Sequence, residues 1–161
     1  MAKGKENKTN VMRVLDSLKL SYISHNYVES GTTVGMEVAK ILHQDPKNVF
    51  KTLVTISGSK KHYVFLVPVC KELDLKKAAK SVGEKKIEMI KSKELLPLTG
   101  YIHGGCSPIG MKKFFTTTID QSAKEIEHIF FSGGKIGFQV EMAFADLEKA
   151  ISYQMADIVV D

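Results

Sequence analysis

Apolar residues recur along this chain with the spacing of helices in some segments and of strands in others. One helical stripe consists of Val11, Val14, Leu15 and Leu18. It predicts a helix over residues 9–19. The other expected elements are a strand over 22–28, a helix capped by Thr32-Thr33 and ended by Asp45-Pro46, strands over 49–57 and 62–69, helices over 75–82 and 92–96, a strand over 114–119, a hairpin of 129–132 with 136–142, a helix over 144–151 and a strand over 158–160. This alternation favours a single mixed α/β (α+β) domain.

The strand over 62–69 is apolar at every position from Tyr63 to Val67 rather than at alternate positions. Such a run is typical of a strand that is covered on both faces. We therefore expect this strand at the centre of the sheet.

Composition places the chain among globular proteins. It has 161 residues, of which 43% are hydrophobic and 25% charged, which suits one domain with one substantial core. The first eight residues are basic, and no apolar stretch follows them, so we interpret residues 1–8 as a flexible basic arm and 9–161 as the domain. Two cysteines form no disulfide framework, and no segment is apolar enough to span a membrane, so we expect a cytoplasmic protein.

Positive charge is concentrated in one part of the chain. The net charge is +5, Arg13 is the only arginine, and residues 71–93 hold eight lysines against four acids. Clustered lysines suit a phosphate backbone, which they neutralise without reading sequence. A solvated helical face explains the same cluster equally well, and both interpretations stay open.

Lys51 is the first candidate for chemistry. It shares one face of its predicted strand with Val49 and Leu53, while the apolar residues Phe50 and Val54 occupy the other. Since both faces look buried, we expect Lys51 to project into an apolar or enclosed space, where a lysine is rare unless it is paired or functional. The pattern favours a site over the alternative, a lysine that protects an exposed edge strand.

Two glycine-containing segments are further candidates. The loop from Gly104 to Gly110 leaves backbone amides open to an anion or oxyanion, although an ordinary turn is equally compatible. It is no Walker-type phosphate loop, because Met111 stands where lysine is required. Ser132 precedes Gly133-Gly134, a dipeptide that mainly indicates a hairpin, and its hydroxyl could face a pocket.

The remaining reactive side chains give weak signals. The five histidines show no metal-binding spacing, so we expect neither a metal nor another cofactor. Cys106 has no evident partner base, and we interpret it as an inert, small buried residue.

Several motifs together carry a resemblance. They are Asp45-Pro46, Val49-Phe50-Lys51-Thr52-Leu53, Leu75-Lys76-Lys77-Ala78-Ala79, Gly100-Tyr101-Ile102-His103-Gly104-Gly105-Cys106-Ser107-Pro108-Ile109-Gly110, Phe131-Ser132-Gly133-Gly134-Lys135 and Asp146-Leu147. Their order and spacing resemble those of the YbaK/EbsC family over almost the whole chain, from about residue 9 to 160. The family is similar to the editing domain of bacterial prolyl-tRNA synthetase. The resemblance implies a curved, barrel-like mixed β-sheet flanked by helices.

The resemblance also implies an activity, partners and site residues. The implied activity is hydrolysis of Cys-tRNA(Pro) in trans, with the tRNA as substrate and prolyl-tRNA synthetase as a partner. Such editing is needed where cysteine and proline are too similar in size for binding to separate them. The implied residues are Lys51 and Gly104 as catalytic groups, and Tyr27, Thr52, Ser132 and Gln139 as substrate-binding groups. Thr52 is the weaker candidate, and Gln139 departs from members that carry aspartate there.

The mechanism that the family suggests is substrate-assisted, with the thiol of the esterified cysteine attacking its own carbonyl. The protein would then supply orientation and carbonyl polarisation. Two alternatives remain at this stage: a deacylase for another mischarged tRNA such as Ala-tRNA(Pro), and a non-catalytic module that binds tRNA or a synthetase.

Overall fold

The computed structural model describes residues 8–161. The predicted basic arm therefore lies outside the described residues, apart from Lys8. The elements in chain order are α2 (Asn10–Ser17), β1 (Ile23–Asn26), η1 (Val28–Ser30), α3 (Gly35–Ile41), β2 (Phe50–Ser57), β3 (His62–Pro68), α4 (Leu75–Ser81), β4 (Ile87–Met89), α5 (Ser92–Thr99), β5 (Thr116–Asp120), η2 (Gln121–Glu125), β6 (His128–Ser132), β7 (Phe138–Ala143), α6 (Phe144–Ala150) and β8 (Gln154–Ala156).

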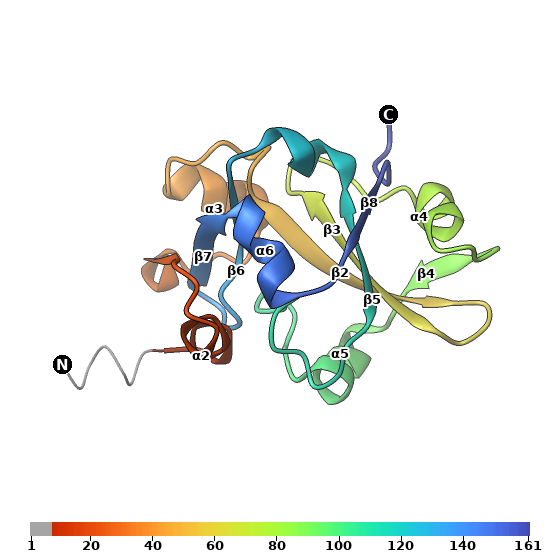
Figure 1. The fold of residues 1–161 in the computed structure, drawn as a ribbon, viewed down its shortest axis with the longest axis horizontal. Coiled ribbons are helices and arrows are strands. Elements are labelled where there is room, and N and C mark those ends of the chain that lie inside the picture. The colour runs from red at the N-terminus through yellow and green to blue at the C-terminus, as the bar shows by residue number, and fades with distance from the viewer. Residues whose placement is uncertain (1–7) are drawn as a thin grey trace.

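The strands form two open sheets (Figure 1). One has the order β1-β7-β6 and is antiparallel. The other has the order β4-β2-β3-β5-β8, in which β3 and β5, and β5 and β8, are parallel. The sheets meet at an isolated bridge between Val49 and Phe130. The mixed α/β class is as predicted, but the strands of the described residues do not close into the expected barrel.

β3 lies inside its sheet and is covered on both faces, as its apolar run predicts. Val64 and Leu66 belong to the main core, and Phe65 and Val67 to a second cluster beneath α4. All four are at most 1% exposed. The run is therefore apolar because each face of β3 meets a different core.

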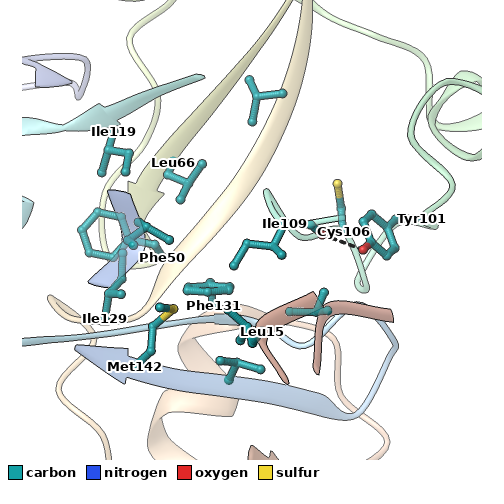
Figure 2. Packing of buried hydrophobic residues seen from close by; sticks show 14 of the residues in the cluster. Leu15, Phe50, Leu66, Tyr101, Cys106, Ile109, Ile119, Ile129, Phe131 and Met142 are labelled. Atoms are coloured by element: carbon teal, nitrogen blue, oxygen red, sulfur yellow. Dashed lines mark hydrogen bonds between the residues drawn. The ribbon is translucent and has the colours of Figure 1, made fainter. Parts of the chain in front are cut away.

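The main core lies between α2 and the two sheets (Figure 2). Leu15 of α2 packs with Phe131 and Met142 of the smaller sheet, and Phe50 and Leu66 come from the larger one. Thr9 begins α2 by accepting a hydrogen bond from the Met12 N–H through its side chain.

Several predicted boundaries differ from the structure. The last strand is β8 rather than residues 158–160, because the fully buried Ile158 fills the second cluster beyond the strand end. α5 continues past Pro97 to Thr99, where Gly100 caps it by donating its N–H to the Leu96 carbonyl. β4 was not predicted, since three residues are too few to show a period.

α3 starts later than expected. Its N-cap is Val34, whose N–H donates to the Thr32 hydroxyl, and that hydroxyl in turn donates to Glu37. Thr32 thus orders the turn before the helix and does not cap the helix itself.

No helix in the described part of the chain is long and apolar enough to cross a membrane.

Candidate active site

A cavity of about 500 Å³ lies between the two sheets, α3, the start of α5 and the loop after Tyr101. The structure brings every sequence-predicted site residue to its wall: Tyr27, Lys51, Thr52, Gly104, Ser132 and Gln139. These residues come from five separate segments of the chain. Their chemical roles remain predictions, but their convergence on one cavity is a property of the fold.

The floor of the cavity is the open edge of β2. β4 pairs with β2 at Thr55–Ser57, so among the described strands β2 has no partner on that side between Lys51 and Val54. The Val54 carbonyl points to this side, since it accepts a hydrogen bond of 3.3 Å from the Ile90 N–H. Main-chain groups two residues apart face the same edge of an antiparallel strand, so the Thr52 N–H and carbonyl also point toward this side. Consecutive residues from Val49 to Val54 accordingly line the cavity.

Lys51 is half-buried rather than enclosed. Its side chain is 30% exposed, and its Nζ lies 3.6 Å from Oε1 of Glu72, which is itself 82% exposed. The expectation that Lys51 projects into an apolar or enclosed space is therefore met in part: Lys51 lines the cavity, but its side chain is partly exposed. Lys51 lies in the part of β2 that β4 does not pair with, and this unpaired edge is part of the cavity wall. The two interpretations of Lys51, a site residue and a lysine on an exposed strand edge, therefore both describe its position. An exposed pair at this distance contributes little energy, so the ammonium remains available to a ligand.

Thr52 has an unusual hydroxyl. Its Oγ1 is shielded from solvent and has no hydrogen-bond partner among the described residues. Register places Thr52 opposite Leu66, on the face of β2 that carries Phe50 and Val54. A polar atom on this apolar face is costly unless something bonds to it.

Gly104 occupies a position that only glycine fits well. Its φ is +87°, and a Cβ there would lie 3.1 Å from Cβ and Cγ2 of Thr33. The loop that follows is anchored by Tyr101, whose hydroxyl donates a hydrogen bond of 2.6 Å to the Ile109 carbonyl (Figure 2). This bond joins the two ends of the loop, and the main chain can approach a ligand closely at Gly104.

The opposite wall comes from β6 and β7, where Ser132 and Gln139 are cross-strand partners. The Ser132 hydroxyl accepts a hydrogen bond of 3.1 Å from the Gly134 N–H in the turn between these strands. Ser132 therefore belongs both to the predicted hairpin and to the cavity wall. Gln139 is 3% exposed and exchanges two hydrogen bonds with the side chain of Gln44, at 2.7 and 2.9 Å. Tyr27 is 8% exposed, and burial raises the pKa of its phenol, so it is uncharged at neutral pH.

Sequence reasoning did not assign three further residues of the wall, which are His103, Lys91 and Cys106. His103 could have been found from its place beside Gly104, and Lys91 belongs to the lysine cluster of residues 71–93, which gave no reason to place it in the cavity wall. Cys106 was interpreted as inert, and burial raises the pKa of its thiol to about 12, so it stays protonated at neutral pH. No group of three or more His, Cys, Asp or Glu in residues 8–161 is placed to hold a metal ion.

Comparison with known proteins places this site in a family. Residues 28–150 match the aminoacyl-tRNA editing domain. The chain belongs to the aminoacyl-tRNA editing domain family. All predicted site residues lie within the matched segment except Tyr27, which directly precedes it.

A curated relative and two solved structures agree with this family membership. A protein of Enterococcus faecalis, named as a candidate Cys-tRNA(Pro)/Cys-tRNA(Cys) deacylase, EbsC, is 42% identical over 160 residues, covering 98% of each chain. A hypothetical protein of known structure has a TM-score of 0.85 at 20% identity, covering 94% of this chain and all of that one. A candidate trans-editing enzyme for prolyl-tRNA synthetase has a TM-score of 0.82 at 22% identity, covering 94% of this chain and 96% of that one. At such identities the two structures show that the editing-domain fold is shared.

Proposed function

We propose that this protein is a trans-editing hydrolase that cleaves the ester of mischarged Cys-tRNA(Pro) in the cytoplasm. The observation that carries the proposal is the meeting of Lys51 and the Gly104 main chain at one cavity above an open strand edge. Membership of the editing family and the name of the E. faecalis relative support the substrate class. The cavity volume of about 500 Å³ is typical of small-ligand sites and leaves room for an aminoacyl group with its ribose.

The cavity favours a substrate-assisted reaction because it offers no activated nucleophile of its own. The Cys106 thiol is held protonated by burial. The Ser132 hydroxyl accepts a turn amide, and no base within residues 8–161 is hydrogen-bonded to it. The thiol of the esterified cysteine would attack its own carbonyl carbon, forming a C–S bond. The ester C–O bond then breaks, the proton of the attacking thiol passes to the tRNA 3′ oxygen, and a thiolactone leaves. Lys51 and the Gly104 N–H would stabilise the charge that develops on the carbonyl oxygen.

Exposed lysines beside the cavity suit the tRNA backbone. Lys71, Lys91 and Lys93 are exposed and, within residues 8–161, have no carboxylate within 4.0 Å. Lys91 lines the cavity itself, which would place a phosphate close to the terminal nucleotide. Lys77, in contrast, bonds to Asp157 and Asp161 and belongs to the solvated side of the lysine cluster.

The first test is release of amino acid from Cys-tRNA(Pro) by the Lys51→Ala variant. We expect at least about a hundredfold loss of turnover, the scale on which losing one oxyanion-stabilising group acts. Stability should change by less than about 0.5 kcal/mol, since Lys51 makes only a long, exposed pair. Lys124→Ala is the matched control, because Lys124 is exposed in η2 and lies outside the cavity wall. Unchanged turnover in Lys51→Ala, in a protein that still binds tRNA, would favour a non-catalytic binding module.

Substrate choice and partner need two parallel assays. Hydrolysis of Cys-tRNA(Pro) is compared with that of Ala-tRNA(Pro) and Pro-tRNA(Pro), and faster loss of alanine than cysteine would establish the alternative specificity. The same assays are repeated with prolyl-tRNA synthetase, which we propose as the partner that selects the tRNA. A strong preference of the isolated protein for tRNA(Pro) would show that it reads the tRNA without help.

A further inference from the structure

The ionisable side chains that line the cavity are either basic or uncharged. They are Tyr27, Lys51, Lys91, His103 and Cys106. Burial raises the pKa of both the Tyr27 phenol and the Cys106 thiol, so neither is an anion at neutral pH. Among the described residues of the wall there is no aspartate or glutamate. Within residues 8–161 the cavity therefore presents only positive and neutral groups.

The acids on the surrounding elements are engaged elsewhere or lie outside the wall. Glu141 shares a face of β7 with Gln139, but its two carboxylate oxygens each lie 2.8 Å from an imidazole nitrogen, of His25 and of His128. Burial opposes ionisation of Glu141, yet these two bonds outweigh it and hold its pKa below its usual value. Its carboxylate is thus already engaged in hydrogen bonds within the small sheet.

Four other acids flank the cavity without entering its wall. Glu72 is 82% exposed and is the long-range partner of Lys51. Glu37 of α3 accepts the Thr32 hydroxyl, and Glu88 of β4 and Glu94 of α5 lie outside the lining residues. Lys40 and Lys93 on these same helices add positive charge.

Gln139 is the buried polar residue of the wall that would meet the amino acid. Its amide carbonyl accepts from Gln44 Nε2 at 2.7 Å and its amide nitrogen donates to Gln44 Oε1 at 2.9 Å. The pair fixes the orientation of the Gln139 amide and leaves it one N–H and one lone pair for a ligand. Both partners are neutral, so this wall offers hydrogen bonds but no countercharge.

A positive cavity discriminates between the two forms of an aminoacyl ester. Its α-amino group has a pKa of about 7.8, so both the ammonium and the amine are present near neutrality. Burying an ammonium beside lysines without an acid is unfavourable, whereas an amine can use the hydrogen bonds of an amide. Building on the proposed function, we infer that the site binds its substrate with the α-amino group uncharged, and that Gln139, positioned by Gln44, determines this choice.

The test compares two ligands that cannot react. One is adenosine carrying S-methylcysteine through a 3′-amide, and the other has a hydroxyl in place of the α-amino group. Their dissociation constants for the full chain are measured by calorimetry between pH 6.0 and 8.5. With a pKa of about 7.8, the α-amino group of the ligand is about 83% uncharged at pH 8.5 and about 1.6% uncharged at pH 6.0. The amino ligand should therefore bind about fifty-fold more weakly at pH 6.0 than at pH 8.5. The hydroxy ligand should change less than about threefold, since it carries no group that titrates in this range, and any contribution of the protein is common to both ligands.

The Gln139→Glu variant provides the second arm. It keeps the length of the side chain and a hydrogen bond from Gln44 but introduces a countercharge, so the preference of the amino ligand for high pH should flatten to below about fivefold. The wild-type comparison decides whether the amine is bound uncharged, and a Gln139→Glu variant that binds both ligands but keeps the fifty-fold dependence overturns the role of Gln139. Equal pH dependence of the two ligands, or tighter binding of the amino ligand at pH 6.0, overturns the inference and leaves the proposed function intact. Failure of both ligands to bind, together with no release of cysteine from Cys-tRNA(Pro) at any pH, overturns both.

Discussion

The unpartnered hydroxyl of Thr52 predicts that one substitution makes this protein more stable and less active. Thr52→Val replaces the hydroxyl with a methyl group of nearly the same shape. The Oγ1 atom is shielded from solvent and has no hydrogen-bond partner among the described residues, so the folded state carries the cost of its desolvation. Valine keeps the branched side chain that suits a strand and packs equally well beside Phe50 and Val54.

The magnitude follows from the cost of such a group. A buried, unsatisfied polar atom costs about 1–3 kcal/mol, and the relaxed site recovers part of this, so we expect a gain of about 1 kcal/mol in the free energy of unfolding. A slope of about 2 kcal/mol per molar urea converts this gain into an increase of about 0.5 M in the unfolding midpoint. Thr55→Val is the matched control, because the fully buried Thr55 on the same strand donates a hydrogen bond of 2.9 Å to the Tyr63 carbonyl. The same substitution there should cost about 1 kcal/mol.

The activity assay tests whether the unpartnered Thr52 hydroxyl serves substrate binding, which would explain why the folded protein carries its desolvation cost. Unsatisfied groups gather at functional sites, and we expect the Thr52 hydroxyl to gain its partner when substrate fills the cavity. Thr52→Val should then raise KM for Cys-tRNA(Pro) several-fold while the urea midpoint rises. A variant that is less stable than wild type would refute the structural reasoning, because the hydroxyl would then have a stabilising partner in the free protein. A more stable variant with unchanged KM would remove Thr52 from the substrate-binding residues.

Three further changes have definite expected outcomes. Iodoacetamide at pH 7.5 should modify only the exposed Cys70 of the native protein and both cysteines in urea, since burial raises the Cys106 pKa to about 12; mass spectrometry counts the adducts. Glu141→Gln should lower stability by about 1 kcal/mol at pH 6. The pKa of Glu141 is held below its ordinary 4.5, so this stabilisation is present above that value and is lost as the pH falls through the lower folded pKa, which urea midpoints at pH 6 and 3 would reveal. Gly104→Ala should destabilise by about 1–2 kcal/mol through its left-handed backbone and remove most turnover, because the Cβ would press on Thr33 and shift the amide.

The fold could be predicted where the local sequence pattern reflects how an element is buried by distant parts of the chain. The apolar run of β3 indicated burial on both faces, and both cores are present. The hydrophobic pattern did not predict the ends of helices and strands that tertiary packing determines. Ile158 is fully buried without belonging to a strand, so its hydrophobicity misplaced β8, and Gly100 rather than Pro97 ends α5.

The sequence identified individual candidate residues for the site, but it did not predict the contacts between these residues and their neighbours. The motifs pointed to six residues that meet at one cavity, and their roles await the experiments above. The partner of Gln139 could not be foreseen, because Gln44 lies 95 positions away and carries no distinctive pattern. The partial exposure of Lys51 also escaped prediction, because its apolar neighbours in the sequence do not show how far other elements cover its side chain.

Size alone cannot protect correctly charged Pro-tRNA(Pro) from this cavity. A space of about 500 Å³ that admits cysteine also admits proline, which differs little in volume. If the protein supplied a nucleophile, both esters would be cleaved. The wall instead contributes polarising groups, a protonated thiol and hydroxyls without a base. Under the proposed mechanism the substrate thiol is the nucleophile, so proline and alanine survive because they lack one. Specificity then arises from the chemistry of the substrate, and rapid cleavage of Ala-tRNA(Pro) would show that a water attacks the ester instead.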